Sequence, residues 1–201
     1  GCHGAMPELG VDPINIAAHI YISLQEIIAR EISATQSAVL TIGKFVGGEA
    51  ANIIPGEVVM EGTIRSLNKE IGEFIFNRVN DIVISTAKMF RGEAELIELS
   101  SVPPLTNDTE LSKEVTSYLK DLLGEKSVVL FEGGGMGSED FASYSYKVPS
   151  VYLMLGAGTK QENPLYGEAM HNEKVVFNED ILVTGAAMHT YSAIMWLKNN
   201  K

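Results

Sequence analysis

The sequence is poor in cysteine and in basic residues, and each shortage excludes a class of protein. Cys2 is the single cysteine among 201 residues, so no internal disulfide framework can form, and this usage fits the reducing cytoplasm, where we expect the protein to be. The 15 Lys and Arg residues are outnumbered by 26 Asp and Glu residues, which gives a formal net charge of -11. That balance argues against a nucleic-acid or anionic-membrane partner, because both require clustered basic side chains.

Long apolar runs are missing as well. No run reaches the roughly 18 residues needed to span a bilayer, and no segment has the pattern of a signal peptide. The remaining composition, 45% hydrophobic and 20% charged, is ordinary for a globular protein, and the length fits one domain or two small ones. The first residues, GCHGA, include no initiator methionine, so we expect the chain to be a portion of a longer protein.

The first half of the sequence predicts the order helix, strand, strand, helix, strand. Asp12 followed by Pro13 is typical of a helix start, and apolar residues at helical spacing follow. The later predicted elements are strands at 38–46, 57–66 and 93–99 and a helix at 69–90. A strand before residue 7 would complete βαββαβ, so we expect a ferredoxin-like domain that lacks its first strand over residues 1–102.

The second half, residues 103–201, predicts helices that alternate with short apolar strands. The paired prolines Pro103 and Pro104 are the best linker candidate, because proline stops both helices and central strands. Beyond them the sequence predicts helix starts at Asn107 or Asp108, Ser138 and Asn178, and strands at 128–131 and 151–155. Two strands do not form a stable sheet alone, so this α/β half is expected to need further strands from the parent chain.

His171 is the first candidate for chemistry. It follows a long polar, Gly-rich loop and precedes an apolar triplet and a helix start. A loop histidine held between rigid elements can act as a metal ligand or a proton carrier, although a lone histidine is more often an ordinary surface residue. The helix histidines His19 and His189 are interpreted as structural. Asn52, near the end of a long connection, either supports a turn or offers its amide to a ligand.

Four stretches of the sequence resemble motifs of one family and stand in that family's order. GCHGAMPELGVDPI is similar to GGHGA-x-P…G-x-D-P-I, and GGEAANIIPGEVVMEGTIRS is similar to GG-x-A-x-N-V-I-P…EGT-x-R. GGMGSEDFASY is similar to MGGEDFA-x-Y, and LGAGTKQENPLYGEAMHNEKVVFNED is similar to LG-x-G…LH-(N/S)-P-x-F-x-F-x-ED. The family is the M20 metallopeptidase superfamily, in the amidohydrolase branch that includes aminoacylases, hippurate hydrolases, auxin-conjugate hydrolases and N-acetyldiaminopimelate deacetylases.

The resemblance implies a two-part enzyme that hydrolyses the amide of N-acyl-L-amino acids. A zinc-peptidase-like α/β catalytic domain would hold two divalent metal ions, zinc or manganese, and a ferredoxin-like lid would be inserted into it. Residues 1–102 would form the lid, which pairs with the lid of a second subunit in a homodimer. Residues 103–201 would form the C-terminal part of the catalytic domain.

The resemblance also assigns roles to single residues. His171 matches the last metal ligand, and His3 matches a lid histidine that reaches the partner's active site to stabilise the oxyanion of the tetrahedral intermediate. Substrate-contacting positions are matched by Asn52, Arg65, Gly137 and Glu139. Arg65 is suited to hold a substrate carboxylate through a bidentate pair, whereas Glu139 can equally serve the first turn of a helix.

The sequence departs from the family pattern in several places. Cys2 stands where the family has glycine, and Glu173 stands where it more often has proline. The resemblance places the remaining metal ligands and the acidic general base before residue 1, so we expect the isolated chain to be inactive. Two other interpretations stay open: a dipeptidase or aminopeptidase of the same superfamily, and a non-catalytic ferredoxin-like module that works through dimerisation or ligand binding.

Overall fold

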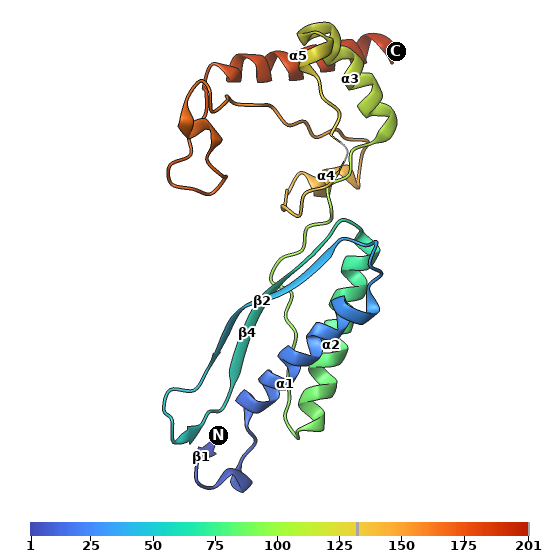
Figure 1. Cartoon of the computed structure of the whole chain (residues 1–201). Helices are drawn as coiled ribbons and strands as arrows, with labels where there is room; N and C mark the ends of the chain where they lie inside the picture. Colours follow the sequence, from blue (N-terminus) through green and yellow to red (C-terminus); the bar gives the residue numbers. More distant parts are fainter. Residues whose placement is uncertain (132, 201) are drawn as a thin grey trace. The chain divides into compact units, whose positions relative to one another are not determined.

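A computed structural model describes residues 1–131 and 133–200, and the contacts among these residues divide the chain into two units (Figure 1). Unit 1 comprises Gly1–Pro104 and Gly134–Glu139, and unit 2 comprises the rest of the described residues. The elements of unit 1 are β1 (Cys2–His3), η1 (Pro7–Leu9), α1 (Pro13–Glu26), η2 (Ile27–Glu31), β2 (Ala38–Gly47), β3 (Ile53–Ile54), β4 (Val58–Ser66) and α2 (Lys69–Met89). Those of unit 2 are α3 (Thr109–Leu123), η3 (Glu125–Ser127), α4 (Ala142–Ser145), η4 (Pro164–Gly167) and α5 (Ile181–Asn199). The mixed α/β fold class predicted from the sequence is confirmed.

The sheet of unit 1 is an antiparallel hairpin of β2 and β4. Ala38 lies opposite Ser66 and Gly47 lies opposite Val58, with a shift of register between Ile42 and Lys44. Alternate residues of each strand point to one face, as pleated backbone requires. The hairpin residues that pack against the core of the unit are Ala38, Leu40, Ile42, Met60 and Ile64.

Two helices supply the rest of this core. α1 begins as the sequence predicts, because the Asp12 side chain accepts hydrogen bonds from the N–H groups of Ile14 and Asn15 at 2.9 and 3.2 Å. α2 begins after Asn68, whose side chain accepts a bond from the N–H of Ile71 at 2.9 Å. The buried apolar residues at helical spacing are Ile16, Ile20, Leu24 and Ile27 on one side and Ile75, Val79, Val83 and Ala87 on the other.

Gly62 in β4 lies where the neighbouring strand leaves no room for a side chain. A Cβ at this position would overlap the backbone carbonyl oxygen of Thr41, which cannot swing away as a side chain can. We therefore expect Gly62→Ala to lower the free energy of unfolding of unit 1 by about 1–3 kcal/mol, the usual cost of overpacking. Gly43→Ala is the matched control, because a Cβ there meets open space. Urea unfolding of both variants checks this; equal midpoints would contradict it.

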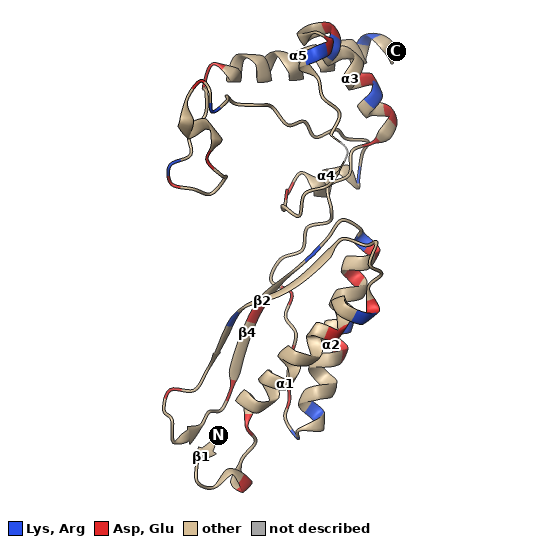
Figure 2. Cartoon of the chain, in the orientation of Figure 1, with Lys and Arg blue, Asp and Glu red and all other residues tan. Residues whose placement is uncertain are grey.

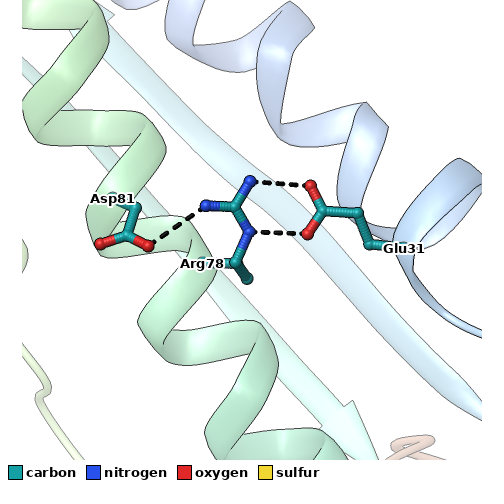
Figure 3. A network of polar contacts seen from close by, with 3 residues as sticks. All are labelled: Glu31, Arg78 and Asp81. Carbon is teal, nitrogen blue, oxygen red and sulfur yellow. Dashed lines mark hydrogen bonds and ion pairs between the residues drawn. The ribbon is translucent and has the colours of Figure 1, made fainter.

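An ion-pair network joins η2 to α2 and was not predicted from the sequence (Figure 3). The Arg78 guanidinium donates to both carboxylate oxygens of Glu31, at 2.6 and 2.8 Å, and to Asp81 at 3.2 Å. Glu31 ends a single π-helical turn that follows α1, so this turn carries the carboxylate that faces Arg78. The bidentate geometry holds η2 against the middle of α2.

The same network makes unit 1 sensitive to acid. Hydrogen bonds from Arg78 hold the pKa of the Glu31 carboxyl below its ordinary value. A lowered folded-state pKa stabilises the fold above the unfolded pKa of about 4.3, and that stabilisation disappears as the pH falls through the folded pKa. We expect Arg78→Met to lose stability at pH 7 but to show a shallower further loss between pH 5 and pH 3 than the unchanged chain.

Urea midpoints across this pH range measure the difference. Lys113→Met is a suitable control, because it removes an ion pair whose side chains are 67% and 78% exposed and which we expect to contribute little. If the urea midpoints of Arg78→Met fall with pH in parallel with those of the unchanged chain, the prediction is contradicted.

The prediction of a strand at 93–99 is wrong. The segment alternates as predicted, because Ala94 and Leu96 pack against the core while Glu93 and Glu95 are exposed. Within the described residues, however, it pairs with no other strand. Alternation sets which side chains face inward, but a strand also requires a hydrogen-bonded neighbour.

Unit 2 is organised around α3 and α5. α3 begins after Asp108, whose side chain accepts a bond from the N–H of Leu111 at 2.8 Å, and it ends before Gly124, where φ is +88°. Val115, Leu119 and Met188 form the buried centre of the contact between the two helices. Leu182 and Val183 of α5 are 69% and 75% exposed, so this largely apolar helix buries only part of its surface in the described chain.

The segments 128–131 and 151–155, predicted as strands, have no regular secondary structure and are not paired into a sheet among the described residues, so both strand assignments are wrong. Val128, Val151 and Leu153 nevertheless pack against the centre of α3 and α5. Asn107 bonds to Tyr152 as a neighbouring strand would: its amide donates to the Tyr152 carbonyl at 3.0 Å and accepts from the Tyr152 N–H at 2.7 Å. The Asn107 side chain thus makes the two backbone bonds that a neighbouring strand would make to Tyr152.

Charged residues of both signs are interspersed over the helices and strands. Figure 2 shows Lys and Arg on β2, α2, α3 and near the end of α5, with Asp and Glu among them. Several form ion pairs with their neighbours, such as Lys120 with Glu125 at 2.8 Å. Among the helices that the structure describes, none is long and apolar enough to cross a membrane.

Candidate functional site

His3 and Asn52 lie next to each other at one end of unit 1. β1 pairs with β3 so that His3 lies opposite Ile53, and the N–H of Gly4 donates to the Asn52 carbonyl at 2.8 Å. A Cβ at Gly4 would lie 3.0 Å from that oxygen, so glycine permits the close approach. Both side chains are exposed. The structure therefore brings together two of the residues that the sequence singled out.

The His3 ring is oriented by its own backbone. The N–H of Ala5 donates to His3 Nδ1 at 3.1 Å, and the N–H of Met6 donates to the His3 carbonyl at 2.8 Å, which closes a tight turn. Cys2, beside it, is half-buried, and a Cβ on Gly10 would lie 2.6 Å from its sulfur. The Cys2 thiol is thus a packing group in this structure.

Arg65 lies at the other end of the hairpin. It is half-buried near the end of β4 and pairs with Val39. Along β4 it stands seven residues beyond Val58, where the strand begins close to the β3 end, which corresponds to roughly 23 Å at about 3.3 Å per residue. The structure does not bring Arg65 together with His3 and Asn52.

Gly137 and Glu139 belong to the segment Gly134–Glu139, whose contacts place it in unit 1. A Cβ on Gly134 would lie 2.9 Å from the side chain of Leu67, two residues beyond Arg65, so this segment reaches the Arg65 end of the hairpin. The helix start predicted at Ser138 is wrong: α4 begins at Ala142, without a side-chain cap. Glu139 therefore lies before the helix rather than in its first turn.

His171 lies in unit 2 on an exposed turn, and its backbone is left-handed, with φ +64°. This conformation is uncommon outside glycine and marks positions held by their surroundings. Asn172 holds the turn, because its side chain donates to Glu168 at 3.2 Å and accepts from the N–H of Lys174 at 2.9 Å. The N–H of Asn178 donates to the Ala157 carbonyl at 2.9 Å and so closes the base of the loop.

A complete metal site is not formed within the described part of the chain. No three His, Cys, Asp or Glu side chains converge there in a way that could hold an ion. A dinuclear centre needs several such ligands, so these residues do not fit one by themselves.

Comparison with known proteins gives one family match. The model of the family described as "Peptidase dimerisation domain" matches residues 1–89, which include His3, Asn52 and Arg65. The uncharacterized hydrolase y4tI of Sinorhizobium fredii is 37% identical over 182 residues, which cover 90% of this chain and 44% of that protein. The IAA-amino acid hydrolase ILR1-like 2 of Arabidopsis thaliana is 32% identical, over 98% of this chain and 45% of its own length. The hippurate hydrolase of Campylobacter jejuni is 30% identical, over 98% of this chain and 50% of its own length.

Solved structures agree with this match. A structure from methicillin-resistant Staphylococcus aureus has a TM-score of 0.79 at 28% identity and covers 96% of this chain and 49% of that one. The YXEP protein of Bacillus subtilis is described as a dinuclear metal binding peptidase from the M20 family. It has a TM-score of 0.72 at 24% identity, and the match covers 94% of this chain and 47% of that one. The chain spans about half the length of the curated relatives that it matches.

Proposed function

We propose that this chain forms part of a metal-dependent hydrolase of the M20 metallopeptidase superfamily, one that cleaves the amide bond of N-acyl amino acids. The observation that carries the proposal is the similarity over 98% of the chain to hydrolases named for IAA-amino acid conjugates and for hippurate. Both names describe an acyl group joined to an amino acid by an amide. We assign this chain to a longer polypeptide of the relatives' length, and we call that polypeptide the complete enzyme.

We assign His3 and Asn52 to the reacting amide. The two residues lie on adjoining backbone segments at one end of unit 1, and both side chains are exposed, so each can offer a hydrogen-bond donor to a ligand there. Donors fixed before the reaction stabilise the negative charge that develops on the carbonyl oxygen during hydrolysis, and each is worth several kcal/mol of barrier.

Arg65, Gly137 and Glu139 are assigned to substrate binding at a different position. The length of β4 separates Arg65 from His3 by more than one small N-acyl amino acid can bridge. In a homodimer, each lid can present His3 and Asn52 to the partner's active site, while Arg65 and the segment Gly134–Glu139 serve the site of their own subunit. Arg65 would there hold the substrate carboxylate.

His171 is proposed as one metal ligand of the complete enzyme, in which zinc or manganese would be bound. Neutral imidazole is the commonest metal ligand among side chains, and the bonds of Asn172 fix the turn that carries the ring. Because the described residues supply no complete ligand set, we expect this chain alone to be inactive.

We also propose that residues 1–102 form the lid and that residues 103–201 form part of the catalytic domain. The proposed location is the cytoplasm.

The dimer is proposed to form along β2 and α1. In the described chain β2 pairs only with β4, so its outer edge offers unpaired backbone groups. Beside this edge lies a mainly apolar groove of about 440 Å³ between α1 and β2, lined among others by Tyr21, Ile22 and Phe45. These three side chains are 44%, 68% and 47% exposed. A second copy can extend the sheet and cover the groove in one symmetric contact.

We expect Ile22→Glu to weaken dimerisation about 100-fold, because in a symmetric interface each substitution acts twice and each removes about 1.5 kcal/mol or more of apolar burial. Met89→Glu is the control, since Met89 is 69% exposed at the end of α2 and does not line the groove. Sedimentation velocity over a concentration series measures both; equal dissociation constants would contradict this interface.

The proposed activity is tested with N-acetyl, N-benzoyl and indoleacetyl amino acids in the presence of excess Zn²⁺ or Mn²⁺. We expect the complete enzyme to release the amino acid and this chain alone to release none. Turnover by the chain alone would contradict the proposed division of the metal site.

The second candidate is a peptidase of the same superfamily, favoured by the description of the YXEP protein. It would prefer dipeptides, whose free amino group N-acyl amino acids lack.

A further inference from the structure

The contact between His3 and Ala5 determines which ring nitrogen of His3 carries the proton. The backbone N–H of Ala5 donates to His3 Nδ1 at 3.1 Å. A backbone N–H can only donate, so Nδ1 must accept and must be without a proton. The neutral ring therefore carries its proton on Nε2.

The backbone around this contact is fixed by two hydrogen bonds and by a strand pairing. Met6 N–H to His3 carbonyl closes the turn at 2.8 Å, Gly4 N–H to Asn52 carbonyl anchors it at 2.8 Å, and β1 pairs with β3. The Ala5 amide is consequently held at a set position relative to the ring.

We propose that the backbone amide of Ala5 is a positioning group that restricts His3 to one neutral tautomer, in which Nε2–H is the ring's only free polar group. Since Nδ1 is occupied, a ligand meets a hydrogen-bond donor. His3 is thereby suited to hold a developing oxyanion, and it is not suited to accept a proton or to bind a metal ion in this state. This assignment of a role rests on the proposed function, whereas the tautomer does not.

Nitrogen-15 NMR of the full chain, labelled in histidine, tests the tautomer directly. The His3 signals are identified by their loss in His3→Gln, and spectra are recorded at a pH where the rings are neutral. We expect His3 to show an unprotonated Nδ1 and a protonated Nε2. We expect His189, which is exposed on α5, to show the averaged signals of exchanging tautomers.

Two variants of Ala5 test the cause. Ala5→Ser keeps the amide and is expected to keep the single tautomer, whereas Ala5→Pro removes the donor and is expected to give His3 the averaged signals of His189. Protection of the Gly4 amide from hydrogen exchange reports whether the turn persists in Ala5→Pro. If it does not persist, replacing Ala5 by lactic acid removes the donor without the proline ring, with the same expected result.

The proposal is overturned if His3 in the unchanged chain shows averaged tautomers or a protonated Nδ1. It is also overturned if His3 keeps its single tautomer after the Ala5 donor is removed. The proposed function fails separately: a single His3 tautomer in a complete enzyme that does not hydrolyse N-acyl amino acids would leave the positioning role standing and remove only the reaction.

Discussion

Replacing His3 by alanine in the complete enzyme is expected to lower kcat by about 10²–10³-fold, the usual cost of losing one oxyanion donor. The donor acts on charge that exists only in the transition state, so kcat and kcat/KM should fall together while KM changes little. Because the ring offers Nε2–H and no free acceptor, His3→Gln, which retains an N–H donor, should recover at least tenfold of the loss.

Steady-state kinetics with an N-acetyl amino acid measure the three enzymes. His189→Ala is the control, because His189 is an exposed residue of α5 with no part in the proposed site. An enzyme that keeps its kcat within a few-fold after His3→Ala would exclude the oxyanion role. Equal losses in His3→Ala and His3→Gln would instead indicate that His3 carries a proton.

Replacing Ile75 by alanine is expected to lower the free energy of unfolding of unit 1 by about 2–5 kcal/mol. Ile75 is fully buried in α2, within the cluster that includes Ile20 and Leu24 of α1. Truncation leaves a cavity between the two helices and the hairpin, and the loss is a large share of the 5–15 kcal/mol that stabilises an ordinary domain.

The readout must distinguish the two units. Trp196, the single tryptophan, lies in unit 2, so its fluorescence reports on that unit, whereas hydrogen exchange of the α2 amides reports on unit 1. Ile84→Ala is the matched control, because Ile84 lies on the same helix and is 43% exposed. If both variants lose the same exchange protection in α2, the buried cluster is not what stabilises unit 1.

The helices and the hairpin could be predicted because their signals are local. Asp12 with Pro13 marks the start of α1, and the residues Val58 to Ser66 alternate as a half-buried strand does. The segment 93–99 was assigned wrongly for the opposite reason. Its alternation is real, but whether a neighbouring strand pairs with it is a property of the whole fold and leaves no mark in the segment itself.

The sequence proposes residues for the candidate site but does not indicate which of them lie together. The motifs singled out His3, Asn52 and Arg65, yet only the pairing of β1 with β3 shows that the first two are neighbours and that Arg65 lies apart. The pair of Glu31 with Arg78 was missed because 47 residues separate its members. The Ala5 amide was missed because its partner, His3 Nδ1, depends on a turn that the sequence does not specify.

The most direct test of the central proposal compares two substrates of the complete enzyme that share one amino acid. One is the N-acetyl amino acid, and the other is the dipeptide with an alanine in place of the acetyl group; both are assayed before and after removal of metal by a chelator. We predict a kcat/KM at least tenfold higher for the N-acetyl compound, lost on chelation and restored by Zn²⁺ or Mn²⁺. A preference for the dipeptide, or hydrolysis that persists without metal, would contradict the assignment as a metal-dependent N-acyl amino acid hydrolase.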